Sequence, residues 1–560
     1  MLQELMTIRG ENLTGTPWEI YPRPQMVRDS YLNLNGYWEF GVGEQAAFDR
    51  KIQVPFCPEC VLSGVKTHFG EGQNLWYKRT VRVPEGFVRG RVLLHFGAVD
   101  QVADVYVNGV HVGHHEGGYD AFWFDVTHVM QEENEIVVRC VDDLRDQAFP
   151  YGKQVMKRGG MWYTPVSGIW QTVWMESVPE TYVQKLSIEN RGYAVTISTE
   201  PKLNGYVQVE GLGDFALVNG SVTIAPEEPK LWSPEEPNLY EFTLAAGEDV
   251  IWSYFAIRAL EIKKIGKYPR LCLNGKPYFF HGLLDQGYWP DGLFTPAAPE
   301  SYVDDILAMK KLGFNTLRKH IKVEAEEFYY QCDKLGMIVW QDMVNNSDYN
   351  FLRDTALPTA GIQKLDDRKW HADERSRGEF KKEAEAAVMQ LKNHPSICYW
   401  TIFNEAWGQF DSDNVFEWFK GLDDTRFVDA TSGWFRREKS DVDSRHVYFR
   451  KVKLKGDGEK PLILSEFGGK TYRAENHVFN PDKTYGYGGC ESLEQLNEAV
   501  KKLYLEEVLP CIENGLCAAI YTQVSDVEDE INGLVSYDRK VEKLKPEVMV
   551  PVAKQLKIEG

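Results

Sequence analysis

The sequence predicts three successive domains: an N-terminal β jelly-roll sandwich, a small immunoglobulin-like β-sandwich and a C-terminal (β/α)8 TIM barrel. Three observations support this. The chain has 560 residues, too many for one hydrophobic core, so about two to four domains are expected. Up to about residue 260 the pattern is of short alternating runs with hardly a helical period. Beyond residue 262, strand-like and helix-like segments alternate.

Residues 1–180 are expected to form the jelly roll. Short strands are predicted at 81–83, 91–96, 103–107 and 136–140. The segment VYVNGVHVGHH places Asn108 and Gly109 between two such runs, which is the signal of a type I′ β-hairpin. Turns that break short alternating strands in this way are typical of an antiparallel sandwich or jelly roll.

Residues 181–260 form a second all-β unit, again of short strands. Proline-rich connections interrupt it at APEEPKLWSPEEPNLY. Its size of about 80 residues suits a small immunoglobulin-like sandwich.

Residues 261–560 are expected to form the barrel. Strands are predicted at 278–281, 315–320, 337–342, 397–403, 427–430, 445–448, 461–467 and 516–523. Helices are predicted at 300–312, 324–335, 378–392, 414–422 and 492–507. Eight strands joined by helices or loops over this length are typical of a (β/α)8 barrel.

The composition of the chain excludes some classes of binding partner. The net charge of −20 repels phosphate backbones and anionic headgroups, so neither nucleic acid nor a membrane is an expected partner. The first residues carry no apolar segment of signal-peptide type, and no stretch is apolar enough to span a bilayer. Nine scattered cysteines fit free thiols in a reducing compartment. We therefore expect a cytoplasmic protein, with a homo-oligomer left open.

In a (β/α)8 barrel the working residues lie where strands end and loops begin. Polar and aromatic residues gather at the predicted strand ends: Asp285, Arg318, His320, Asp342, Asn404, Glu405, Trp407, Trp434, His446, Tyr448, Glu466, Tyr521 and Gln523. Such convergence around two glutamates is the inventory of a site that cleaves sugars.

Cleavage of an acetal through an oxocarbenium-like transition state needs one protonated and one ionised carboxyl. Glu405 and Glu466 end the fourth and seventh predicted strands. A single glutamate at a strand end is more often a solvent-facing loop residue, but this pair coincides with polar residues on neighbouring strands. Arg318 would keep Glu466 ionised if it projects beside it. As a retaining pair, the two carboxyls should lie about 5–5.5 Å apart.

Over nearly its full length the chain resembles glycoside hydrolase family 2. The family's sugar-binding jelly roll is similar to LHFGAVDQVADVYVNGVHVGHHEGGYDAFWFDVT and GGMWYTPVSGIWQTVWME, and its join into the barrel to SYFAIRALEI. Its acid/base signature resembles KNHPSICYWTIFNEAWG, and its nucleophile strand LILSEFGG. The resemblance implies a retaining exo-β-glycosidase with Glu405 as general acid/base, Glu466 as nucleophile and Asn404 holding the sugar 2-hydroxyl.

Departures from the family pattern bear on metal and sugar. The second barrel strand reads NTLRKHIK, one residue shorter than usual and without Tyr-Pro, which leaves the role of His320 open. Metal-dependent β-galactosidases carry Gly and His soon after the acid glutamate, whereas Ala406-Trp407-Gly408-Gln409 follows here. We see no convergent His/Asp/Glu ligand set near Glu405 and expect neither metal nor cofactor.

The expected substrate is a small-molecule or oligosaccharide β-glycoside, with galactose as the terminal sugar. β-Glucuronidases usually carry Asn-x-Lys after the eighth strand to hold the sugar carboxylate, but NGLVSYDRK stands here. Acidic residues at this place would also repel a uronic acid: Asp526, Glu528, Asp529 and Glu530. The alternatives are a β-uronidase that uses Lys319, Lys322 or Arg436, and a non-catalytic carbohydrate-binding protein.

Two long connections are expected to contribute to the site. Residues 345–370, after the third barrel strand, have few apolar residues at helical spacing, and loops of this length are often lids. We expect them to recognise the leaving group. Residues 142–163 are expected to reach from the jelly roll over the barrel mouth.

Overall fold

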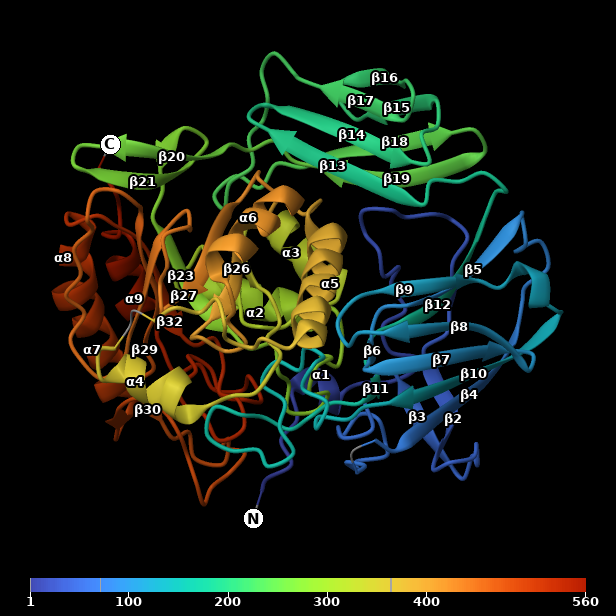
Figure 1. The fold of residues 1–560 in the computed structure, drawn as a ribbon, viewed down its shortest axis with the longest axis horizontal. Coiled ribbons are helices and arrows are strands. Elements are labelled where there is room, and N and C mark those ends of the chain that lie inside the picture. The colour runs from blue at the N-terminus through green and yellow to red at the C-terminus, as the bar shows by residue number, and fades with distance from the viewer. Residues whose placement is uncertain (1, 71, 363–364, 560) are drawn as a thin grey trace.

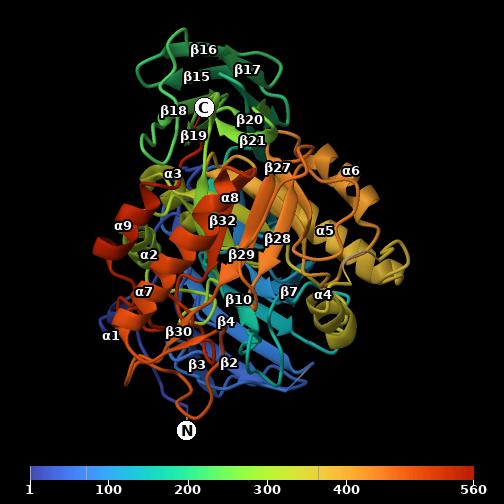
Figure 2. The same ribbon diagram turned by 90° about the vertical axis from the view of Figure 1, so that its left-hand side faces the viewer.

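The structure is a computed structural model that describes residues 2–70, 72–362 and 365–559. Figure 1 shows the N-terminal sandwich in blue, the second sandwich in green above, and the barrel in yellow to red. In Figure 2, turned by 90°, the second sandwich again lies at one end of the molecule. Among the described residues, no helix has both the length and the apolar character needed to cross a bilayer. The nine cysteines are free thiols.

The N-terminal sandwich consists of two antiparallel sheets. The smaller sheet has the order β1 (Leu32–Asn33), β12 (Val173–Val178), β5 (Arg91–Phe96) and β9 (Phe122–Asp125). The larger has the order β3 (Arg50–Val54), β2 (Gly36–Val42), β4 (Asn74–Arg82), β10 (Glu133–Val141), β7 (Val102–Val107) and β8 (Val110–Glu116). Alternate residues of β10 are buried, which places one face of the sheet on the core.

The predicted type I′ hairpin is confirmed. Strands β7 and β8 pair antiparallel around Asn108 and Gly109, which both have positive φ angles, 52° and 77°. A type I′ turn requires positive φ at both central residues. The short strand predicted at 81–83 is the end of the much longer β4.

The second sandwich follows with a three-stranded and a four-stranded sheet. The first sheet contains β13 (Lys185–Arg191), β14 (Ala194–Glu200) and β17 (Ser221–Ile224). The other contains β16 (Gly213–Leu217), β15 (Gly205–Val209), β18 (Tyr240–Ala246) and β19 (Asp249–Phe255). Their facing side chains, including Val195, Val207 and Phe242, form one hydrophobic core.

Eight parallel strands form the barrel. Their order is β27 (Phe427–Ser432), β26 (Ile397–Asn404), β25 (Ile338–Asp342), β24 (Thr316–Lys319), β23 (Phe280–Asp285), β32 (Leu516–Thr522), β29 (Leu462–Gly468) and β28 (Asp443–Val447). The outermost strands of this order, β27 and β28, contact each other, so the barrel is nearly closed. The predicted fold class is confirmed.

Helices surround the barrel, and the helix expected at 378–392 is four residues longer at its start. They are α2 (Glu300–Lys311), α3 (Glu326–Leu335), α4 (Leu357–Thr359), α5 (Glu374–Leu391), α6 (Ser412–Leu422), α7 (Leu493–Leu503), α8 (Leu509–Ile512) and α9 (Pro546–Ala553). The Asp373 side chain accepts a hydrogen bond from the Ser376 amide and so caps α5. A π-helical turn at Tyr504–Val508 separates α7 from α8.

Several short elements complete the fold. They are α1 (Ile8–Glu11), the 3-10 turn Thr127–Val129, the π turn Leu352–Ala356, and the strands β6 (Val99–Asp100), β11 (Gly168–Ile169), β20 (Leu260–Ile265), β21 (Tyr268–Leu273), β22 (Lys276–Pro277), β30 (Thr471–Tyr472) and β31 (Gly489–Cys490).

The connection at 142–163 lies against the barrel, as expected from the sequence. The Tyr151 amide donates to the Asn345 carbonyl over 3.0 Å, and the Tyr151 hydroxyl donates to the Ser347 carbonyl over 2.7 Å. Asn346 returns a hydrogen bond of 2.6 Å to the Ala148 carbonyl. These contacts join the connection to the loop after β25, so the first domain contributes directly to the barrel mouth.

Candidate active site

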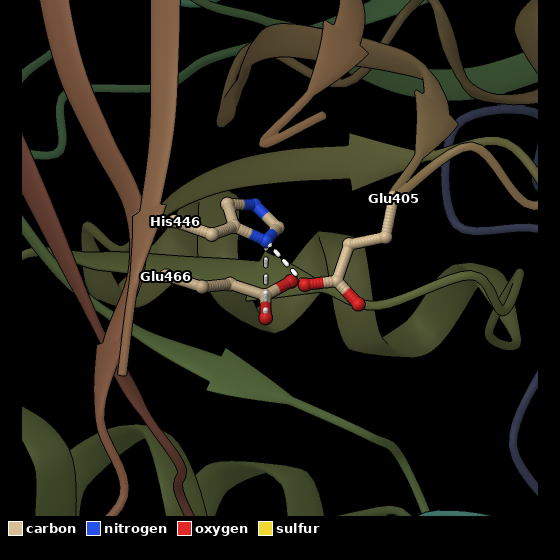
Figure 3. A group of neighbouring side chains, drawn as sticks. All are labelled: Glu405, His446 and Glu466. Carbon is tan, nitrogen blue, oxygen red and sulfur yellow. Dashed lines mark hydrogen bonds and ion pairs between the residues drawn. The ribbon is translucent and has the colours of Figure 1, made fainter. Parts of the chain in front are cut away.

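Two glutamates face each other where β26 and β29 end. Glu405 follows the last residue of β26, Glu466 lies near the end of β29, and His446 lies on β28. Figure 3 shows both carboxylates directed at one imidazole nitrogen: Nδ1 of His446 is 2.7 Å from Glu405 Oε1 and 3.6 Å from Glu466 Oε2. The facing oxygens of the two glutamates lie within 4.8 Å of each other, so both carboxyls share one small site.

Glu466 is held on two sides. Nη1 of Arg318 donates to Oε1 over 3.1 Å, and the Tyr448 hydroxyl donates to Oε2 over 2.6 Å. Burial by itself would raise the pKa of Glu466, but the charges of His446 and Arg318 outweigh it and hold that pKa below its ordinary value. Glu466 is therefore an ionised carboxylate at neutral pH, as attack on an anomeric carbon requires.

Arg318 also organises the neighbouring strands. Its Nη2 atom donates to Asn404 Oδ1 and to Asp342 Oδ2, both over 2.9 Å. Asp342 Oδ2 in turn lies 2.9 Å from Nδ1 of His320. Burial is the main reason that the pKa of His320 falls to about 4, and the charge of Lys153 is the second. His320 is thus a neutral ring at the edge of the site.

Glu405 ends its strand in an unusual backbone conformation. Glu405 and Ala406 have φ angles of 49° and 68°, in the left-handed region that residues with a side chain seldom adopt. Such strain is retained where the surrounding structure fixes it, often at functional sites. Here the turn lets the Glu405 side chain reach His446 rather than continue along the strand.

Three buried donors in the site have no hydrogen-bond partner among the described residues. They are Nδ2 of Asn404, Nε1 of Trp407 and Nε1 of Trp434. A buried donor without a partner is costly, so these groups are suited to the hydroxyl oxygens of a bound sugar. Trp407 stacks on Trp162 with ring centroids 5.0 Å apart, and Tyr349 meets the Trp407 ring edge-on at 5.7 Å.

Three residues predicted for the site use their polar groups elsewhere. Tyr521 packs against Phe467 and Tyr504, and its hydroxyl accepts the Lys470 amide. It therefore belongs to the packing between barrel and helices, and the prediction that it lines the site is wrong.

Gln523 and Asp285 have partners within the protein as well. Gln523 accepts from Gln286 over 2.7 Å and donates to Asn532 over 2.9 Å. Asp285 forms an ion pair of 2.7 Å with Lys319. Neither offers the free hydroxyl-binding group that the sequence suggested.

The cations proposed for a uronide are also engaged. Lys319 and Lys322 each lie 2.9 Å from Oε1 of Glu324. Arg436 forms an ion pair with Asp443. Because each is paired within the protein, none is available for a sugar carboxylate.

The acidic residues after β32 are paired too. Lys543 lies 2.6 Å from Asp526. Arg158 from the 142–163 connection lies 2.8 Å from Asp529 and 3.4 Å from Glu528. Glu530 accepts a hydrogen bond from the Tyr163 hydroxyl. Two cations face four carboxylates, so these contacts reduce the expected repulsion of an anionic sugar.

Sequence reasoning missed residues that reach the site from the first domain, and two small hydroxyl residues that end barrel strands. Lys153 and Trp162 come from the 142–163 connection, whose length was the one available signal. Ser432 fixes the far side of His446, with Oγ 2.9 Å from Nε2, and the Thr522 hydroxyl lies 2.8 Å from that of Tyr448. Ser432 and Thr522 each end a strand, but a small hydroxyl residue there has no distinctive sequence pattern.

The sequence led us to expect no group of metal-ligating side chains near Glu405, and the positions of the side chains contradict that expectation. In the part of the chain that the structure describes, Glu405, His446 and Glu466 form one group whose ligand atoms could hold a metal ion. Two of these three side chains already have strong partners, because Glu466 is bound by Arg318 and Tyr448 while His446 is bound by Glu405 and Ser432. The prediction that no metal is needed stays a prediction.

Sequence profiles of one family match nearly the whole chain. Residues 58–179 match "Glycosyl hydrolases family 2, sugar binding domain", residues 179–258 match "Glycosyl hydrolases family 2", and residues 264–544 match "Glycosyl hydrolases family 2, TIM barrel domain".

Relatives with two different activities are similar to the chain. A β-galactosidase from Thermoanaerobacter pseudethanolicus is 25% identical over 460 residues, which is 73% of this chain. A β-glucuronidase from Bacteroides fragilis is 24% identical over 424 residues, which is 70% of this chain. In both cases the match spans 58% of the relative's own length.

Solved structures share the complete fold. A β-glucuronidase from an uncultured Clostridium species aligns with a TM-score of 0.73 at 18% identity, covering 96% of this chain and 99% of that one. A β-galacturonidase from Eisenbergiella tayi aligns with a TM-score of 0.68 at 20% identity, covering 97% and 98%. At these identities the likeness concerns the fold alone.

Proposed function

Because this chain belongs to family 2 of the glycosyl hydrolases, we propose that it is an exo-β-glycosidase that releases one terminal β-linked sugar with retention of configuration. One observation carries the proposal: the facing oxygens of Glu405 and Glu466 lie within 4.8 Å across the barrel mouth. Paired carboxyls this close leave no room for an attacking water between nucleophile and sugar, which favours double displacement.

In the first step Glu466 attacks the anomeric carbon while Glu405 donates a proton to the departing oxygen. Arg318 holds the nucleophile ionised and in place from one side, and the Tyr448 hydroxyl holds it from the other. Charge developing on the ring oxygen faces an ionised carboxylate, so the oxocarbenium-like transition state is stabilised. The product is a covalent glycosyl ester on Glu466.

In the second step water takes the place of the aglycone and attacks the anomeric carbon while Glu405 removes its proton. The ester bond breaks, which releases the sugar and the Glu466 carboxylate. His446 supports this reversal because its Nδ1 atom hydrogen-bonds Glu405 and keeps the carboxylate directed at the anomeric centre. The Nδ2 atom of Asn404, buried without a partner, is suited to the sugar 2-hydroxyl. Tyr349 and Trp162, which are half-buried and pack on Trp407, offer apolar surface where the leaving group would depart.

The terminal sugar is a separate question. The sequence favours a galactoside over a uronide for two reasons: the missing Asn-x-Lys and the acidic residues after β32. Pairing of these residues with Lys543 and Arg158 weakens the second reason. The missing Asn-x-Lys still favours a galactoside unless another cation reaches the sugar.

A panel of nitrophenyl β-glycosides tests the proposal: galactoside, glucoside, mannoside, arabinoside, glucuronide and galacturonide. Hydrolysis of at least one, with the β-anomer appearing first by NMR, is the expected result. First appearance of the α-anomer would contradict retention. Tight sugar binding without any turnover would instead favour the non-catalytic alternative.

A further inference from the structure

A buried lysine from the first domain stands at the barrel mouth without an anionic partner. Lys153 is only 7% exposed. Its ammonium lies 5.7 Å from the centroid of the Trp407 ring and 5.4 Å from that of Tyr163. Among residues 2–70, 72–362 and 365–559 this ammonium forms no hydrogen bond or ion pair, and its contacts are with the two rings.

The backbone around Lys153 is fixed between the two domains. Its carbonyl accepts the Tyr163 amide over 3.0 Å. The preceding Gly152 has φ +65°, and a Cβ there would come within 3.0 Å of the Ile321 carbonyl, so only glycine fits this close approach. Gly152 also accepts a hydrogen bond from Asn345. Lys153 is therefore placed by the fold rather than free to leave the mouth.

The charge of Lys153 acts on the site already described. After burial it is the main reason that the pKa of His320 is lowered, and it opposes the burial that raises the pKa of Glu530. The oxygens of Glu530 already accept hydrogen bonds from Tyr163 and Asn532. The ammonium thus faces the site with its charge uncompensated by a direct contact.

A second unpartnered donor lies beside it. Nε1 of Trp407 is buried without a partner among the described residues, and Trp407 is two residues from Glu405. Burying a charge unpaired costs several kcal/mol, so a cation kept in such a place is suited to an anion that arrives with the substrate.

We propose that Lys153, with Trp407 beside it, binds the carboxylate of a terminal uronic acid, so that the enzyme prefers β-uronides to neutral β-glycosides. This inference rests on the proposed function. In this proposal a residue of the first domain binds the sugar carboxylate, which the missing Asn-x-Lys of the barrel would otherwise hold. The alternative cations Lys319, Lys322 and Arg436 cannot take it because each is already paired.

The test compares the activity on uronides with that on the corresponding neutral glycosides, in variants of Lys153 and of a control lysine. kcat/KM is measured on the nitrophenyl β-glucuronide, β-galacturonide, β-glucoside and β-galactoside for the wild-type protein and for K153M, K153R and K157M. Lys157 lies on the same connection and is exposed, so K157M removes the same charge from the same segment. Thermal unfolding of each variant shows whether it is folded.

The wild-type protein should prefer a uronide to its neutral counterpart. K153M should lower the ratio of uronide to neutral kcat/KM by about 100-fold, the size expected when one partner of a buried charge pair is removed. K153R should restore part of that ratio, and K157M should change it by no more than about 2-fold.

Equal losses on both substrate classes in folded K153M would overturn the inference, since Lys153 would then serve only packing. So would a wild-type protein that cleaves neutral glycosides and no uronide. Both results leave the proposed function intact. Failure of every glycoside in the panel would contradict the proposed function itself.

Discussion

Arg318 donates from Nη1 to Oε1 of Glu466 across 3.1 Å in the interior of the barrel. The guanidinium is fully buried, so the contact is little screened by water. Burial would raise the pKa of Glu466, but the charges of His446 and then Arg318 outweigh it, so that pKa is lowered.

Replacing Arg318 by Met should move the acidic limb of the pH profile. A carboxyl with a lowered pKa stays ionised down to acidic pH, so removing the cation raises that pKa and shifts the limb of kcat/KM to higher pH. At the optimum we expect a loss of at least about 100-fold. Because Asp342 also loses its partner in this variant, the folded fraction must be measured. An unshifted acidic limb of kcat/KM in folded protein would contradict the role of Arg318 in keeping Glu466 ionised.

Tyr448→Phe also tests how the contacts of Glu466 act on the nucleophile, and it removes fewer contacts than the Arg318 variant. The hydroxyl donates to Glu466 Oε2 over 2.6 Å, and phenylalanine keeps the ring that stacks on Tyr487. We expect kcat to fall by about 10- to 100-fold, with a smaller shift of the acidic limb in the same direction. Wild-type kcat and pH profile in this variant would mean that the hydroxyl does not act on the nucleophile.

The two glutamates should fail in different ways. Glu466→Gln should lose at least about ten-thousand-fold on every substrate, because no ester can form. Glu405→Gln should spare substrates whose leaving groups need no proton, and azide should restore turnover with a β-glycosyl azide as product. A β-azide from rescued Glu466→Gln, together with an α-azide from rescued Glu405→Gln, would show that the roles are exchanged.

Chelation should leave the rate unchanged. Glu405, His446 and Glu466 come close enough to bind an ion, but Arg318 already neutralises Glu466 and the carboxyl pair supplies the proton transfer. The assay is kcat/KM after treatment with a chelator, with metal content measured in parallel. A loss that added magnesium restores would show that this group holds a metal ion.

The central residues of the site could be predicted because they follow from strand ends. Arg318 and His320 lie two apart on a strand and both contact Asp342, as period-two alternation requires. Glu405 and Glu466 end strands whose carboxyl ends must meet at one mouth of a barrel. This reasoning needs the order of strands and nothing about their neighbours.

The errors arise where that information is insufficient. Every residue of β32 is buried, so no polar pattern shows that Tyr521 faces the helices rather than the mouth. The pairing of Lys319 with Asp285 and Glu324 depends on contacts between elements, which spacing does not reveal. Lys153 could not be assigned because its place depends on how the first domain packs against the barrel.

Trapping the covalent intermediate tests the central claim most directly. A 2-deoxy-2-fluoro β-glycoside of the preferred sugar, with a good leaving group, should form the ester quickly and release it slowly, because fluorine destabilises the oxocarbenium-like transition state. Digestion and mass spectrometry should then find one added sugar on the peptide that contains Glu466, and none in Glu466→Gln. A sugar on another residue, or turnover of the normal substrate without any trapped species, would contradict Glu466 as the nucleophile.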